Sequence, residues 1–176
     1  MKSPVFTLHA SAVATEGNVL VFIGPSGAGK TTIARLLAPY TEHWADDRVC
    51  LRLLSEDIWG VADATSKFPD KSSLIEIRRI SLCLDYMPLR AIFVIHKDKT
   101  TYLRKIPEIE SVRLLMASCY ELVLQQHYKL DVRTKQDIFT DMASMIRVNP
   151  VYHLHFEMRP HVFSVLDNEF DFSAKT

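Results

Sequence analysis

The apolar positions of the chain fall into short runs and spaced rows that predict alternating strands and helices. Val19 to Ile23 is an uninterrupted apolar run that is too short for a helix, and it predicts a strand. Leu89 to Ile95 is a longer run of the same kind, typical of a central strand buried on both faces. Between them, apolar side chains from Ile33 to Tyr40 recur at helical spacing, and Pro39 gives the helix a stop.

Further elements follow from the same patterns. Apolar residues with polar ones interleaved from Val5 to Ala14 predict a strand that turns at Glu16–Asn18 and pairs with the strand Val19–Ile23. A polar stretch from Asp63 to Ser73 predicts a surface loop. The other expected elements are a short strand at His43–Ala45, a hairpin of Arg48–Leu54 with Ile58–Ala62, an edge strand at Tyr102–Ile106, buried helices within Glu108–His127, an amphipathic helix marked by Ile138, Met142, Met145 and Ile146, and a strand at Val151–Glu157.

Together these elements predict an α/β fold in one domain that spans residues 1–176. A chain of 176 residues with 48% hydrophobic content is long enough for one core and short for two. Because the predicted hairpin brings antiparallel pairing into a sheet of the α/β type, we expect a mixed sheet with helices packed on it.

The segment after the first apolar run carries a phosphate-binding motif. The sequence GPSGAGKT fits G-x-x-x-x-G-K-[ST], the P-loop or Walker A motif, and stands in the required order of strand, loop and helix. Its glycines let backbone amides turn inward toward a polyphosphate at the N-terminus of the following helix. Lys30 is expected at the β and γ phosphates and the Thr31 hydroxyl at a phosphate-bound Mg²⁺. The residues expected to bind nucleotide are Gly24, Pro25, Ser26, Gly27, Ala28, Gly29, Lys30, Thr31 and Thr32.

The composition narrows the partners of the chain. Lys and Arg number 21, as do Asp and Glu, so the net charge gives no general attraction to nucleic acid or membranes. No apolar run approaches the length of a membrane helix, and the N-terminus lacks the apolar region of a signal peptide. Cys50, Cys83 and Cys119 are odd in number and widely spaced, which argues against a disulfide frame or a zinc site. We therefore expect a cytoplasmic protein without nucleic-acid or membrane partners.

Two adjacent acids, Asp46 and Asp47, follow the short strand His43–Ala45. Ligands of α/β sheets lie beyond the carboxyl ends of the strands, so we expect this pair near the glycine loop. Transfer of a γ-phosphoryl group needs charge neutralisation and positioning, and two carboxylates can divide metal binding from proton transfer. The competing interpretation is a turn in which the acids form a salt bridge with Arg48.

Glycine usage and missing motifs exclude several families that carry such a loop. After Gly29 the only glycine is Gly60, so the glycine-rich signature of ABC-type ATPases is absent. Asp57 to Gly60 fits the D-x-x-G motif of small GTPases, but it follows Lys30 too closely, and no N-K-x-D motif follows. A nucleoside or shikimate kinase would need an arginine-rich lid, which is not evident after Leu89.

The remaining combination of LHASAV, VLVFIGPSGAGKTT and WADDRV resembles the catalytic domain of HPr kinase/phosphorylase and the smaller proteins related to it and to phosphoenolpyruvate carboxykinase. In that family a histidine-bearing strand precedes the loop and an Asp-Asp pair follows the loop helix, which corresponds here to His9, Asp46 and Asp47. The resemblance is specific over residues 8–50. It implies binding of ATP and Mg²⁺ and phosphoryl transfer to a serine or a small-molecule acceptor.

The resemblance also implies roles for single residues. Asp46 is expected as the base and Asp47 as metal support together with Thr31, while Lys30 and His9 complete the catalytic set. The chain departs from the family at residues 76–80, where the triplet Glu-Ile-Arg is followed by Arg and Ile instead of glycine. Two hypotheses for the function stay open: an ATP-dependent kinase, and a nucleotide-responsive binding module without kinase activity. The apolar character of the late helices also favours a homo-oligomer.

Overall fold

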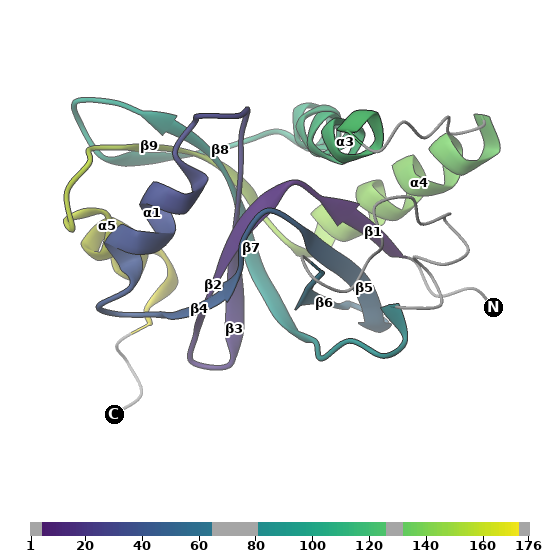
Figure 1. Ribbon diagram of the computed structural model, residues 1–176, viewed down its shortest axis with the longest axis horizontal. Coiled ribbons are helices and arrows are strands. Elements are labelled where there is room, and N and C mark those ends of the chain that lie inside the picture. The colour runs from purple at the N-terminus through teal and green to yellow at the C-terminus, as the bar shows by residue number, and fades with distance from the viewer. Residues whose placement is uncertain (1–4, 65–80, 126–131, 173–176) are drawn as a thin grey trace.

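A mixed sheet forms the centre of the computed structural model, which describes residues 5–64, 81–125 and 132–172 (Figure 1). Within these residues there are nine strands in the sheet and four helices, which keep the labels of Figure 1. The strands are β1 Val5–Leu8, β2 Ala10–Thr15, β3 Asn18–Ile23, β4 Glu42–Ala45, β5 Val49–Ser55, β6 Ile58–Asp63, β7 Met87–Lys97, β8 Tyr102–Lys105 and β9 Val151–Phe156. The helices are α1 Lys30–Leu37, α3 Glu108–Gln125, α4 Val132–Val148 and α5 Val162–Phe170.

Strand β7 is the centre of the sheet. It pairs in parallel with β3 on one side and with β9 on the other, while its first residues pair antiparallel with β6. The path through the sheet is β1-β5-β6-β7-β3-β2-β4, and β8 lies beyond β9. Because parallel and antiparallel pairs both occur, the sheet is mixed, and the predicted α/β fold class is confirmed.

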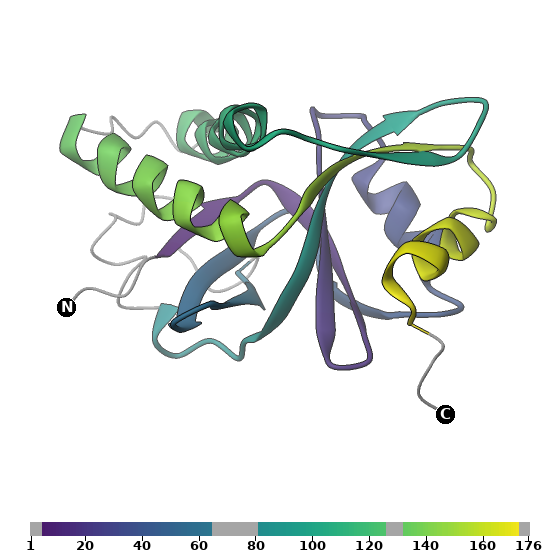
Figure 2. The same cartoon turned by 180° about the vertical axis from the view of Figure 1, so that it is seen from behind.

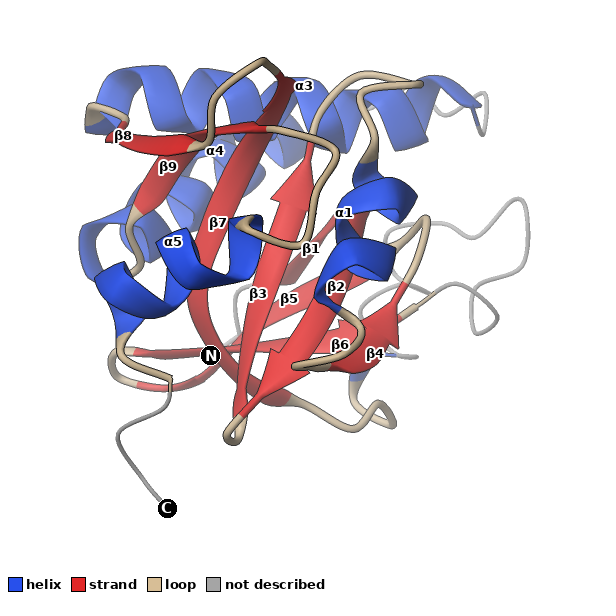
Figure 3. Cartoon of the chain, turned by 90° about the vertical axis from the view of Figure 1, so that its left-hand side faces the viewer, coloured by secondary structure: helices blue, strands red, loops and turns tan. Residues whose placement is uncertain are grey.

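The two faces of the sheet are covered by different helices, which is why β7 is apolar along most of its length. On one face Val21 and Val94 belong to a core cluster with α3 and α4, whose buried residues include Leu115 and Met145. On the other face Phe22 and Phe93 stack with ring centroids 5.4 Å apart and pack with α1 and α5. Figure 3 shows α1 and α5 in front of the strands and α3 with α4 behind them.

Most predicted elements appear close to their expected positions. The hairpin is β5 with β6, the edge strand is β8, and the four apolar positions that marked the amphipathic helix are the buried residues of α4. Figure 2 shows α3 and α4 side by side over the sheet from the opposite direction. One element was missed: α5 was not predicted, although it packs on the sheet through Val162, Leu166 and Phe170.

The predicted strand Val5–Ala14 is two strands with different partners. β2 pairs with β3, as expected, and also with β4, but β1 pairs with β5. The chain bends between them at His9, which therefore lies at a strand junction and not within a strand. The turn from β2 to β3 uses Glu16 and Gly17 with φ of 47° and 76°, the left-handed conformation that suits a two-residue hairpin.

Some sequence predictions concern residues outside the described ranges. The predicted loop from Asp63 to Ser73 falls mostly there, as do the Glu-Ile-Arg triplet and the end of the predicted helical segment Glu108–His127. Cys50, Cys83 and Cys119 are all described and are free thiols, with Cys50 and Cys119 buried. None of the described helices combines the length and the apolar character needed to cross a membrane. The homo-oligomer, the cytoplasmic location and the single-domain boundary stay predictions.

Candidate functional site

The glycine loop, residues 24–31, joins the end of β3 to the start of α1, in the order that the motif predicted. Helix α1 begins at Lys30, and its N-cap Gly29 has a left-handed φ of 105°. Gly27 is also left-handed, at 78°, and the Ala28 amide donates to the Pro25 carbonyl over 3.0 Å. Pro25, Ser26 and Ala28 therefore lie in a tight loop, and Thr32 lies in the first turn of α1. Free amides at such a helix start attract anions.

Two lysines bracket this loop. Lys30 is 8% exposed, and its ammonium donates to the carbonyl oxygens of Gly24 at 2.8 Å and Pro25 at 3.3 Å. Lys97, at the end of β7, donates from Nζ to the Gly27 carbonyl over 3.2 Å. Its stem lies across Gly29, where an added Cβ would be 2.9 Å from Lys97 Cε. Two positive charges thus stand at the loop, which favours a polyanionic ligand.

Asp46 lies beside the hydroxyl of Thr31. Thr31 Oγ1 is 3.3 Å from Asp46 Oδ2 and 3.4 Å from Oδ1. The buried Ser11 hydroxyl of β2 donates to Asp46 Oδ1 over 2.5 Å, and the Asp47 amide donates to the same oxygen over 3.1 Å. Strand β4 places Asp46 here because it pairs with β2, so two neighbouring strands hold the carboxylate against the loop.

Asp47 turns to the opposite side of the strand end and contacts His9. Its φ of 74° is left-handed, a conformation that Asp adopts more readily than most residues. Asp47 Oδ1 is 3.3 Å from His9 Nε2, and the Asp47 side chain is 63% exposed. Ser118 of α3 donates its hydroxyl to the His9 carbonyl over 3.0 Å. The histidine is thus fixed between the sheet and α3, with the Asp47 carboxylate open to solvent.

An apolar cavity of about 190 Å³ adjoins both groups of residues. It is lined by the first residues of the loop, Gly24 and Pro25, by Val94 of β7, and by Leu114, Ala117 and Ser118 of α3. Since Ser118 also binds His9, the cavity lies between the loop and the His9 position. A small apolar group could enter there beside the start of the loop.

The protein oxygens at the site fit a cation that takes most of its ligands from phosphates and water. Within the described part of the chain, no group of three or more His, Cys, Asp or Glu side chains is arranged to hold a metal ion. Mg²⁺ is usually bound by one or two protein oxygens together with phosphates and water. Thr31 Oγ1 and the Asp46 carboxylate are such oxygens, at hydrogen-bonding distance from each other.

A histidine cluster lies on the α3 face of the sheet, with His96 on β7 and with His153 and His155 on β9. His96 Nε2 is 2.9 Å from His153 Nδ1, and His153 Nε2 is 3.5 Å from the Glu110 carboxylate. His155 is 2.9 Å from Asp98 Oδ2 and stacks on Tyr102. His153 is buried, with 8% of its surface exposed. Burial, followed by the charges of His153, His155 and Arg104, lowers the pKa of His96.

The structure thus brings together most of the residues that the sequence singled out. Lys30, Thr31 and Asp46 meet at the loop, while Asp47 and His9 form a separate pair next to them. Sequence reasoning missed Ser11, Ser118 and Lys97. The first two had a visible signal, since each is a polar residue within an apolar segment, and such residues are usually buried only with a hydrogen-bond partner.

Comparisons with known proteins give one family and a distant likeness. The family model described as SynChlorMet cassette protein ScmC matches residues 2–171. Among solved structures, the HPr(Ser) kinase/phosphatase from Coxiella burnetii matches with a TM-score of 0.47 and 9% sequence identity, over 93% of this chain and 95% of that chain. No curated protein matches. A structural likeness of this size carries none of the argument that follows.

The two left-handed glycines of the loop should differ in their tolerance of a methyl group. The loop holds both positions in a left-handed backbone, which costs alanine about 1–2 kcal/mol relative to glycine. Gly27→Ala adds no contact within 4 Å, whereas Gly29→Ala places Cβ 2.9 Å from Lys97 Cε and 3.3 Å from Phe156 Cζ. Because Lys97 Cε is the far end of a flexible side chain, it can move aside at the cost of its hydrogen bond to Gly27. We therefore expect Gly29→Ala to lower the free energy of unfolding by up to about 1 kcal/mol more than Gly27→Ala in denaturant titrations. Equal losses of unfolding free energy in the two variants would show that Gly29 is not crowded. When Lys97→Ala is present in both, the difference between the two glycine variants should become smaller.

The His96 pKa should make stability depend on pH. Because the folded-state pKa of His96 lies below its ordinary value of about 6.5, the unfolded chain takes up the proton first as pH falls. The stability contribution of neutral His96 is therefore complete above about pH 6.5 and is lost as pH falls toward the lower folded pKa. Between about pH 7.5 and 5.5 the wild type should lose more unfolding free energy than His96→Gln, measured with urea. A larger loss in the variant would reverse the sign and refute this.

Proposed function

This chain belongs to the family of the SynChlorMet cassette protein ScmC, and we propose that it binds ATP with Mg²⁺ at the glycine loop. The observation that carries the proposal is the contact between Thr31 and Asp46, 3.3 Å apart, at the start of the helix that follows the loop. The chain is thus a member of the ScmC family, and its relation to HPr kinase/phosphorylase is only a distant structural similarity.

The phosphates would lie against the loop amides and the two lysine ammonium groups. Lys30 and Lys97 both donate to loop carbonyls, so their charges are already placed at the loop surface. The Thr31 hydroxyl and the Asp46 carboxylate would hold Mg²⁺ or its bound water. When bound there, Mg²⁺ would neutralise charge on the phosphates and help to orient them.

Asp47 and His9 are the better candidates for proton transfer from an acceptor hydroxyl. Asp47 is 63% exposed, so an acceptor can reach it, and His9 lies 3.3 Å away to orient or stabilise its carboxylate. This proposal exchanges the two roles that the family resemblance implied, because Asp46 is engaged by Thr31 and Ser11. A base must lie within hydrogen-bond reach of the proton that it accepts, which favours the open carboxylate.

The acceptor is expected to carry an apolar group next to its hydroxyl. The cavity of about 190 Å³ beside Gly24 and Ser118 is lined mainly by apolar side chains, and it lies between the loop and His9. A serine or threonine hydroxyl with an apolar neighbour, or a small hydroxylated molecule with an alkyl group, fits this arrangement. A binding module that senses nucleotide without transfer is the alternative function, and the second experiment below separates the two.

Nucleotide binding should appear as thermal stabilisation that depends on Lys30. A ligand at about 100 times its dissociation constant adds roughly 2.7 kcal/mol to the stability of the folded state. We expect MgATP to raise the melting temperature of the wild type and of Lys105→Met, a control that removes an exposed lysine from β8. Lys30→Met keeps an apolar stem without the charge and should lose most of the shift. Absence of any shift in the wild type with MgATP or MgGTP would refute the proposal.

The two aspartates should separate metal dependence from turnover. Asp46→Asn should weaken the Mg²⁺-dependent part of ATP binding, because it removes a charged oxygen next to Thr31. Asp47→Asn should leave that binding intact and lower phosphoryl transfer by about two to four orders of magnitude, as for a lost general base. Calorimetry with and without Mg²⁺, together with labelled ATP and cell extract, measures both. If instead Asp46→Asn abolishes transfer and Asp47→Asn weakens Mg²⁺-dependent binding, Asp46 is the base and Asp47 supports the metal. If the wild type transfers no phosphoryl group, the binding module is favoured.

A further inference from the structure

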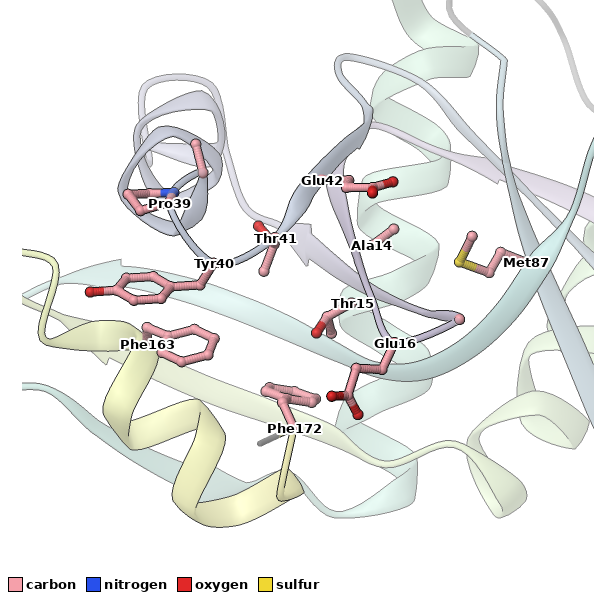
Figure 4. Close-up of a pocket in the computed structure, with 12 residues that line it drawn as sticks. Ala14, Thr15, Glu16, Pro39, Tyr40, Thr41, Glu42, Met87, Phe163 and Phe172 are labelled. Atoms are coloured by element: carbon pink, nitrogen blue, oxygen red, sulfur yellow. The ribbon is translucent and has the colours of Figure 1, made fainter. Parts of the chain in front are cut away.

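A second cavity lies at the opposite end of α1 from the glycine loop. Its volume is about 520 Å³, and it is formed where the β2–β3 turn, the end of α1, the start of β4 and the segment around α5 meet (Figure 4). The cavity shares no lining residue with the candidate nucleotide site. Its volume is in the range of small-ligand sites.

One side of this cavity is aromatic. Tyr40 and Phe163 stack face to face with ring centroids 4.2 Å apart and an interplanar angle of 11°. Phe172 follows next to Phe163, with centroids 6.3 Å apart. Figure 4 shows these three rings as a row along the cavity. The faces of such rings carry partial negative charge and attract cations.

The other side of the cavity is acidic. Glu16 of the β2–β3 turn and Glu42, the first residue of β4, both line it, and none of the described residues that line it is basic. The C-terminal end of α1 adds Ala38 and Pro39 to the wall. The C-terminus of a helix carries partial negative charge. Glu16, Glu42 and the end of α1 therefore all make the electrostatic potential in the cavity more negative.

The hydroxyl of Thr15 gives an independent indication of a ligand. Thr15 is 8% exposed, lines the cavity, and has no side-chain hydrogen bond to any other described residue. Figure 4 shows its side chain between Glu42 above and Glu16 below. A hydroxyl that lines a cavity in this way can accept a hydrogen bond from a bound N–H donor.

We propose that this cavity binds a guanidinium group on an aliphatic stem, such as an arginine side chain. A guanidinium is planar and weakly hydrated, so it stacks on aromatic rings better than an ammonium group does. Its five N–H donors are directed in a fixed plane, enough to reach a carboxylate and the Thr15 hydroxyl together. The cavity is larger than the guanidinium itself, which leaves room for the methylene stem along Phe172.

The test compares a cation with its neutral isostere. N-acetyl-arginine amide and N-acetyl-citrulline amide have nearly the same shape, but only the first carries a charge. In aromatic NMR spectra of the whole chain, the arginine compound should shift the Tyr40 and Phe163 resonances saturably, and the citrulline compound should bind at least about tenfold more weakly. n-Butylguanidine, which has the guanidinium and alkyl stem with the same single charge but no peptide groups, tests the source. Tighter binding of n-butylguanidine assigns the site to small molecules, and tighter binding of the blocked arginine assigns it to a peptide.

Variants locate the binding to this cavity. The double variant Glu16→Gln/Glu42→Gln should lower the affinity for the arginine compound by about tenfold, and Thr15→Val by about twofold to fivefold. The control Glu56→Gln/Glu108→Gln removes two exposed carboxylates elsewhere and should bind as the wild type does. Equal binding of the citrulline compound, full affinity in the Glu16/Glu42 variant, or no saturable shift would each overturn the proposal. A melting temperature and a backbone amide NMR spectrum close to those of the wild type would show that the variants are folded.

Discussion

The parallel pairing of β3 with β7, buried on both faces, is the constraint on which the rest of the structure depends. Ile23, the last residue of β3, pairs with Val94, and β7 continues to Lys97, so the glycine loop leaves the sheet beside the last residues of β7. Lys97 reaches Gly27 for this reason. A loop with two left-handed glycines has little structure of its own, so its shape depends on rigid strands that fix both the entry and the neighbouring wall.

Asp46 and Asp47 are neighbours in the chain but lie in different chemical surroundings. Asp46 is held by Thr31 and Ser11, whereas Asp47, with its left-handed backbone, contacts His9. Neighbouring residues after a strand point to different sides, and the unusual φ of Asp47 widens that separation. One carboxylate therefore lies among hydroxyls beside the loop and the other faces solvent, an arrangement that suits a metal ligand next to a base.

Sequence patterns were sufficient for the strands, for α4 and for the glycine loop, because each depends on local periodicity or on a short motif. They were insufficient where the outcome depends on partners far apart in sequence. Val5–Ala14 has one continuous pattern, yet β1 pairs with β5 and β2 with β3, and only the fold decides where the chain changes partner. The buried position of His153 likewise depends on His96 and Glu110, more than 40 residues earlier. Helix α5 was missed because its nine residues follow a strand without a clear starting signal.

Helix α1 gives the surroundings of its two ends opposite electrostatic character. Its eight residues are held rigidly by Ile33, Ala34 and Leu37, which pack against the sheet and α5. A helix has partial positive charge at its N-terminus and partial negative charge at its C-terminus, so the same element favours an anion at the loop and a cation near Tyr40. Eight residues span only about 12 Å, so both ends act within one small region of the surface. The acids and aromatic rings at one end and the lysines at the other reinforce the polarity that the backbone already sets.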